Sequence, residues 1–139
     1  METTHRKVLV IEDESSIRNL VFGLLAQLGC HADSASDGRE ALAKISREKF
    51  DSVLLDLRCT RVKPEEVIPE IHRLNPNLVG RVLVITGEVA DESSLRLIEE
   101  YFLLHVSHRR LSGDVMGFLR ALLGIPPKPF PSTSSSSDN

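Results

Sequence analysis

Three short apolar runs recur along this 139-residue chain, and segments with apolar residues at helical spacing separate them. The runs are Val8–Ile11, Ser52–Leu55 and Val82–Ile85. Continuous apolar runs of this length are typical of strands that are buried on both faces, as in parallel sheets. Strands that alternate with helices pair in parallel through right-handed crossovers. The sequence therefore predicts an α/β fold, a three-layer sandwich around a parallel sheet.

The apolar periodicity sets the expected bounds of the elements. Pro64 suits a first helical turn, whereas we expect Pro69 only near a helix start or at a kink. Gly29 should end the first helix, and Asn75–Asn77 should form a turn. The expected strands are Lys7–Ile11, His31–Ala35, Ser52–Leu57, Arg81–Thr86 and Phe102–Val106. The expected helices are Ser15–Leu28, Arg39–Glu48, Pro64–Leu74, Glu92–Tyr101 and Gly113–Leu123.

Size and charge narrow the class of protein. A chain of 139 residues suffices for one domain, here 6–123. Residues 124–139 are rich in Pro and Ser and should form a disordered tail or a linker. A net charge of -3 argues against a nucleic-acid surface, and no apolar stretch is long enough to span a bilayer. We expect a cytoplasmic protein with neither nucleic-acid nor membrane partners.

Polar residues follow each of the three apolar runs. The first run ends in Glu12-Asp13, the second in Asp56 and the third in Thr86. Taken alone, acids such as Glu12 and Asp13 are most often found at the start of a helix, which they stabilise. Taken together, they should meet at the carboxyl end of a parallel sheet, where such sheets bind ligands. Crowded carboxylates are unfavourable without a cation, and Mg²⁺ prefers oxygen ligands. The pattern indicates a site for Mg²⁺ and a phosphoryl group.

Four motifs share the order and spacing of a known family. They are Val8–Glu14, Ala35–Leu42, Asp51–Arg58 and Val84–Gly87. With them the chain resembles the response-regulator receiver family over about residues 6–123. The resemblance implies a flavodoxin-like fold with a five-stranded parallel sheet in the order 2-1-3-4-5.

The resemblance also implies roles for individual residues. Asp56 would accept a phosphoryl group from a histidine kinase or a phosphotransfer protein of a bacterial two-component system. Glu12, Asp13, Asp56 and the backbone carbonyl of Arg58 would hold Mg²⁺, and Thr86 would hydrogen-bond the phosphoryl group and move on activation. A carboxylate can form an acyl phosphate, and phosphoryl transfer requires mainly positioning and neutralisation of charge. The protein would be a signalling module with a downstream protein partner. It would not be an enzyme, apart from its own phosphorylation and dephosphorylation.

The chain departs from the family after the fifth expected strand. The family has a lysine there that contacts the phosphoryl group, followed by proline. Ungapped counting from Thr86 places His108 at this position, whereas alignment of Leu111 with the next apolar residue places Arg109 there. Neither is followed by proline, so this loop should take another path. Basic residues around the expected site are either a solvated rim or a replacement countercharge. They are Arg58, Arg61, Lys63, His108, Arg109 and Arg110.

Three other functions are consistent with parts of the pattern. A degenerate receiver would bind partners without regulated phosphorylation. An aspartyl-phosphate phosphatase of the haloacid dehalogenase type would need a second Asp two residues after Asp56, where Arg58 stands. A flavodoxin-like nucleotide binder would need a Gly-rich loop after the first strand, and the sequence has none there.

Overall fold

A parallel sheet forms the centre of the molecule. The computed structural model describes residues 6–87, 91–107, 117, 119–121 and 123–124. Within this part of the chain, all strand pairs are parallel and the order is β2-β1-β3-β4-β5. The predicted fold class and strand order are therefore confirmed. The strands are β1 (Lys7–Ile11), β2 (His31–Ala35), β3 (Ser52–Asp56), β4 (Val82–Thr86) and β5 (Leu104–Ser107).

The helices follow the apolar periodicity closely. Helix α3 occupies the whole range in which a helix was expected, and it continues through Pro69. The missing Pro69 N–H removes one helical hydrogen bond, but burial of Ile68 and Ile71 holds the helix against the sheet. The last expected helix lies mostly outside the described residues, although its described residues from 117 to 123 are helical. The other elements are α1 (Ser15–Gln27), α2 (Gly38–Arg47), α3 (Pro64–Leu74), α4 (Pro76–Val79) and α5 (Glu92–Tyr101).

Two local predictions differ from the structure. The expected turn at Asn75–Asn77 leads into the short helix α4, whose first residue is Pro76. Proline favours this position because its φ is preset and the first helical N–H needs no partner. Strand β5 begins at Leu104, two residues later than predicted, because Phe102 adopts a left-handed conformation (φ 53°) and ends α5.

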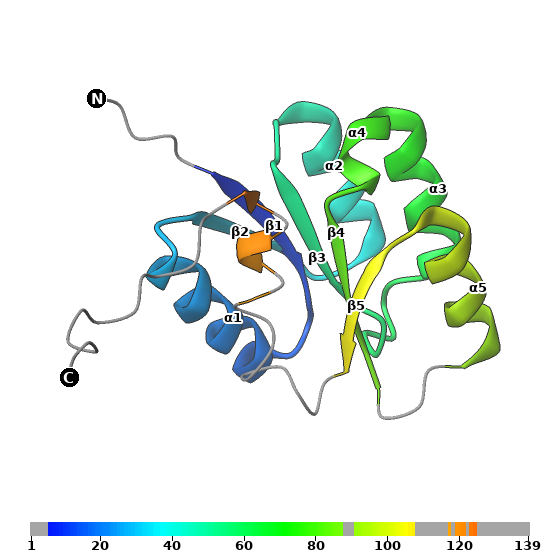
Figure 1. Ribbon diagram of the computed structural model, residues 1–139, viewed down its shortest axis with the longest axis horizontal. Coiled ribbons are helices and arrows are strands. Elements are labelled where there is room, and N and C mark those ends of the chain that lie inside the picture. The colour runs from blue at the N-terminus through cyan, green and yellow to red at the C-terminus, as the bar shows by residue number, and fades with distance from the viewer. Residues whose placement is uncertain (1–5, 88–90, 108–116, 118, 122, 125–139) are drawn as a thin grey trace, which may run out of the picture.

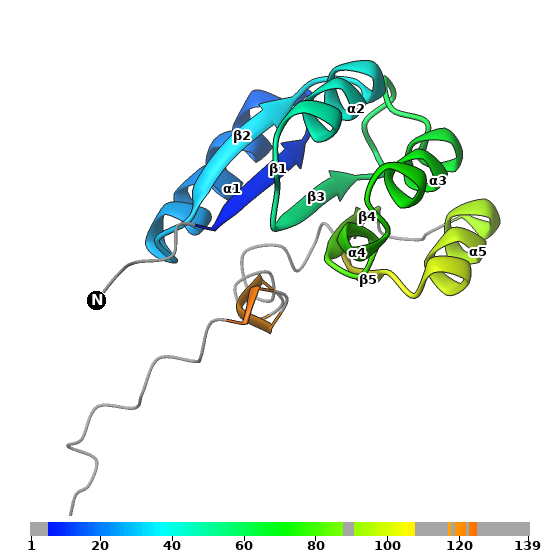
Figure 2. The same cartoon turned by 90° about the horizontal axis from the view of Figure 1, so that it is seen from above.

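Helices cover both faces of the sheet (Figures 1 and 2). Helix α1 lies on one face, whereas α2, α3, α4 and α5 lie on the other. Side chains alternate along each strand, so one buried cluster includes Val8, Val10 and Leu54 and the other includes Leu9, Ile11 and Leu55. The first cluster packs on α1 and the second on α2 to α5. Strands β1, β3 and β4 are thus buried on both sides, which fixes their carboxyl ends in place.

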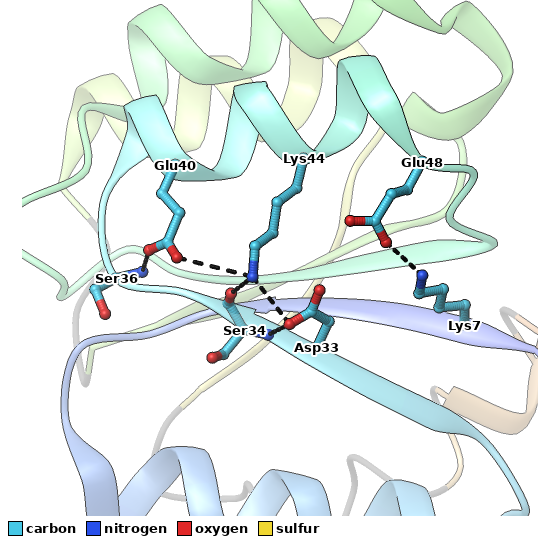
Figure 3. Close-up of polar contacts among 7 residues, drawn as sticks. All are labelled: Lys7, Asp33, Ser34, Ser36, Glu40, Lys44 and Glu48. Carbon is cyan, nitrogen blue, oxygen red and sulfur yellow. Dashed lines mark hydrogen bonds and ion pairs between the residues drawn. The ribbon is translucent and has the colours of Figure 1, made fainter.

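Polar side chains of α2 lie along the free edge of β2 (Figure 3). The Ala35 carbonyl faces β1, where it accepts the Glu12 N–H, so the preceding residue, Ser34, faces the free edge. Lys44 Nζ donates to the Ser34 carbonyl at 2.8 Å and pairs with Asp33 Oδ1 at 2.9 Å. The same Asp33 oxygen accepts the Ser34 N–H at 2.8 Å. Charged groups that satisfy an edge strand are a common protection against pairing with another chain.

We expect Lys44→Met to destabilise the protein and to favour self-association. The substitution leaves the Ser34 carbonyl without its donor and Asp33 without its cation, which should lower the free energy of unfolding by about 1–3 kcal/mol. Lys49→Met is the matched control, since Lys49 is exposed just after α2. Urea denaturation and sedimentation at several protein concentrations measure both effects. Identical results for the two variants would contradict the protective role of Lys44.

Candidate functional site

The register of the two central strands brings two carboxyl groups together. Strands β1 and β3 pair in parallel, and their last matched residues are Ile11 and Leu55. One step further, Glu12 and Asp56 stand opposite one another on strands about 4.8 Å apart. Alternation directs both side chains toward the face that α1 covers. The predicted meeting of these acids at one end of the sheet is therefore what the fold provides.

Asp56 is the last residue of β3 and is only 1% exposed. The main chain stays in the sheet just beyond it, because the Leu57 N–H donates to the Ile85 carbonyl at 2.9 Å. It then turns back, and the Cys59 N–H donates to the Asp56 carbonyl at 3.1 Å. The turn aims the Arg58 N–H at Asp56 Oδ1, with an N···O distance of 2.8 Å. The carboxylate is thus held by its own loop.

Glu12 is 2% exposed and is less well satisfied. Its Oε2 accepts the Glu14 N–H at 3.1 Å, next to the start of α1. Its Oε1 is buried, and no described residue forms a hydrogen bond with it. Burial, followed by the neighbouring Asp56 carboxyl, raises the pKa of Glu12 to about 8. Burial beside another carboxyl group therefore favours the neutral form of Glu12.

Asp13 lies at the same end of the sheet but is exposed. Its charge adds to the effects that raise the pKa of Glu12. Burial raises the pKa of the Cys59 thiol, and the nearby Asp13 carboxylate raises it further. Asp13 therefore lies near both Glu12 and the loop that follows Asp56.

The structure supports part of the donor set expected for a divalent cation. In the described ranges, no three His, Cys, Asp or Glu side chains stand close enough to enclose a metal ion without adjustment. The buried, unpaired Glu12 Oε1 beside the Asp56 carboxylate is nevertheless the kind of oxygen that a hard cation such as Mg²⁺ would satisfy. The residues present fit such an ion, provided that Asp13 or water completes its coordination.

Thr86 is the last residue of β4 and is 5% exposed. The Cα partner of Asp56 on this strand is Ile85, so Thr86 lies one residue beyond the acceptor. Alternation along β4 places Ile85 toward α1 and directs Thr86 to the other face. Thr86 thus lies at the expected end of the sheet. Among the described residues, no hydrogen bond joins it to Asp56.

The Arg58 side chain reaches the site. The sequence left two roles open for it, a solvated rim or a replacement countercharge, and its position beside Asp56 fits the countercharge. Its Nε lies 3.5 Å from Asp56 Oδ1, and one terminal nitrogen lies 3.8 Å from Glu14 Oε1. A Cβ atom at Gly87 would lie 3.7 Å from Arg58 Cδ, so the stem runs beside the exit of β4. In the sequence, only the positive charge of Arg58 points to this path.

The other basic candidates fall elsewhere. Arg61 and Lys63 are exposed and line a separate groove of about 470 Å³ between the starts of α2 and α3. His108 and Arg109, the candidates for the family lysine position, lie outside the described residues, as does Arg110.

Within the described part of the chain, no helix is long and apolar enough to cross a membrane.

Residues 8–105 match the model of one protein family, the response regulator receiver domain. Among curated proteins, the probable transcriptional regulator ycf27 of Guillardia theta is 33% identical over 119 residues, which cover 84% of this chain and 46% of that protein. The alkaline phosphatase synthesis transcriptional regulatory protein PhoP of Bacillus subtilis is 29% identical over 120 residues, which cover 84% and 49%. The chain spans about half the length of these relatives.

Solved structures share the fold. The CheY-like response regulator receiver domain protein of Methanospirillum hungatei superposes with a TM-score of 0.71 at 20% identity, over 88% of this chain and 100% of that one. The chemotaxis protein CheY4 of Vibrio cholerae gives 0.73 at 21% identity, over 86% and 100%. The family match, the sheet order and these neighbours agree. The chain belongs to the response regulator receiver domain family, the phosphoacceptor signalling modules of two-component systems.

Proposed function

We propose that Asp56 of this receiver domain accepts a phosphoryl group from a histidine kinase or a phosphotransfer protein. The observation that carries the proposal is the placement of Asp56. It is a buried carboxylate at the carboxyl end of the central strand, and its Oδ1 is fixed by the Arg58 N–H. Oδ2 would attack phosphorus while the phosphorus–nitrogen bond of the donor phosphohistidine breaks, and the imidazole would leave with the bonding electrons. The product is an acyl phosphate on Asp56.

The same site would hold Mg²⁺ through Glu12, Asp13, Asp56 and the backbone carbonyl of Arg58. The ion would neutralise negative charge on the phosphoryl oxygens, which is the main requirement of phosphoryl transfer. The orphaned Glu12 Oε1 supports the metal assignment, because a cation would replace the proton that Glu12 retains near neutral pH. Thr86 would donate its hydroxyl to a phosphoryl oxygen after a change of orientation.

A second candidate is a receiver that binds a protein partner without regulated phosphorylation. One observation favours it: the family lysine is replaced here by His108 or Arg109. Receiver domains are signalling modules, and either candidate would act on a downstream protein. A cytoplasmic location remains part of this proposal.

We expect Asp56 to become phosphorylated when the protein is incubated with a small phosphodonor and Mg²⁺. Intact mass should increase by one phosphoryl group, and borohydride trapping followed by peptide mapping should locate the label at Asp56. Asp56→Asn should take no label, because an amide is not a competent nucleophile. Thr86→Val is the control and should still be labelled at Asp56.

Two outcomes would change the assignment. Label on Thr86, or label that persists in Asp56→Asn, would show that another group is the acceptor. A protein that binds Mg²⁺ but takes no label from any donor would favour the second candidate, the phosphorylation-independent receiver.

We expect the stability of the metal-free protein to fall as the pH rises between about 4.5 and 8, in part because of Glu12. Its pKa is raised from 4.5 to about 8, so the folded chain retains a proton that the unfolded chain has released in this window. Glu12→Gln should flatten the dependence, because its side chain carries no titratable proton. Urea denaturation in a chelator across this pH range measures the difference, and the exposed residue Glu65, changed to Gln, serves as the control. Equal slopes for wild type and Glu12→Gln would contradict the assignment.

Mg²⁺ affinity should increase with pH, whereas the stability of the metal-free protein falls. Since the ion displaces the Glu12 proton, we expect wild-type affinity to increase over the same pH range and proton release to accompany binding. Calorimetric titrations in buffers of different ionisation enthalpy count the released protons. Binding with no proton release near pH 7 would show that the ion does not displace a proton from Glu12.

A further inference from the structure

We propose that the guanidinium of Arg58 is a built-in cation of the acceptor site. In the metal-free protein it lies beside Asp56 and weakens Mg²⁺ binding, and after phosphorylation it contacts the phosphoryl group. This inference rests on the proposed function. It assigns to the β3–α3 loop the charge that the family supplies from a lysine after the fifth strand.

Main-chain geometry places the Arg58 side chain at the acceptor. The tight turn after β3 directs the Arg58 N–H at Asp56 Oδ1, at 2.8 Å, and the side chain folds back toward the same oxygen. Its Nε lies 3.5 Å from Asp56 Oδ1, which is within ion-pair range although longer than a hydrogen bond. The contact is an ion pair without a hydrogen bond, so a second anion on Asp56 could compete for the guanidinium.

The surroundings of Arg58 are strongly negative. Glu14 Oε1 lies 3.8 Å from one of its terminal nitrogens, and Glu12 and Asp13 lie at the same strand ends. Within the described residues, Arg58 is the cation that pairs with Asp56. Arg18 also reaches this end of the sheet, but its contact is with the Glu12 carbonyl oxygen, at 3.4 Å. Arg58 is thus the described side chain that offsets the acceptor charge directly.

The stem of Arg58 defines where the guanidinium can act. It runs beside Gly87, where an added Cβ would lie 3.7 Å from Arg58 Cδ and 3.9 Å from Cγ. The side chain therefore connects the exits of β3 and β4, between Asp56 and the residue after Thr86. In this proposal, a phosphoryl group carried on Asp56 meets the guanidinium in this space. Arginine suits such a contact because two of its N–H groups can bind two oxygens of a phosphate together.

The charge of Arg58 should affect Mg²⁺ binding and the rate of labelling in opposite directions. A positive charge beside Asp56 repels a second cation, so Arg58 should weaken Mg²⁺ binding. The same charge stabilises the transferring phosphoryl group, whose negative charge is larger than that of the carboxylate, so Arg58 should accelerate labelling. A residue that merely supports the fold would move both measurements in the same direction.

The test compares Arg58→Gln, Arg58→Lys and the control Arg61→Gln with wild type. Arg61 is an exposed arginine of the same loop, but it lines the groove between α2 and α3. Mg²⁺ affinity is measured by calorimetry without a phosphodonor, and the labelling rate is measured at saturating Mg²⁺ with a small phosphodonor. We expect Arg58→Gln to bind Mg²⁺ roughly three- to tenfold more tightly and to be labelled about tenfold more slowly, as expected for loss of one charge-assisted contact.

Arg58→Lys should retain the wild-type Mg²⁺ affinity, because it keeps the charge, and should recover only part of the labelling rate, because an ammonium lacks the paired N–H groups. Arg61→Gln should change both values less than Arg58→Gln does. Circular dichroism verifies that each variant is folded. If Arg58→Gln does not fold, the comparison of Arg58→Lys with wild type decides alone, and an equal labelling rate overturns the inference.

The failure of this inference is distinguishable from failure of the proposed function. Equal Mg²⁺ affinity in wild type and Arg58→Gln, or weaker binding and slower labelling together, overturns the inference even when Asp56 is labelled normally. If wild type takes no label, the proposed function fails, and the phosphoryl contact fails with it.

Discussion

Glu12 and Asp56 face each other at the ends of two paired strands, and the chemistry of the site depends on this contact. The main chain that carries the two carboxyl groups is held in place, because the strands are buried on both faces. Three features accompany this contact. Burial and the neighbouring Asp56 carboxyl raise the pKa of Glu12, one Glu12 oxygen has no hydrogen-bond partner among the described residues, and Nε of Arg58 lies 3.5 Å from Asp56 Oδ1. All three features relate to the same excess of negative charge at the strand ends.

The rigidity of the centre contrasts with the polar edges of the sheet. Strands β1, β3 and β4 consist almost entirely of buried residues, whereas β2 has one buried residue and is satisfied along its free edge by Lys44 and Asp33. This division holds the strands that carry Glu12 and Asp56 in place and leaves polar, solvated chain at the edge of the sheet. A signalling module needs this combination, because a new charge at the acceptor must be transmitted to loops that can move.

The proposed role of Arg58 changes where the cation of the acceptor site comes from. A lysine after the fifth strand would link the acceptor charge to β5. A guanidinium that arises two residues after Asp56 links it to the β3–α3 loop and, through its stem, to Gly87 at the exit of β4. Phosphorylation would then be felt first at β3 and β4. The match covers about half the length of the transcriptional regulators, so the downstream partner belongs to the proposed function and is not taken from those relatives.

Sequence alone determined the alternation of strands and helices, because apolar periodicity is a local property that survives without knowledge of the fold. It also placed Glu12, Asp13, Asp56 and Thr86 at strand ends, and the resemblance to the receiver family supplied the strand order. Only the tertiary structure decided the register that sets Glu12 against Asp56, and the direction of the Arg58 side chain. Register and side-chain direction depend on residues far apart in the chain, so no local pattern contains them. For the same reason the left-handed conformation of Phe102, which delays the start of β5, is a property that only the tertiary structure decided.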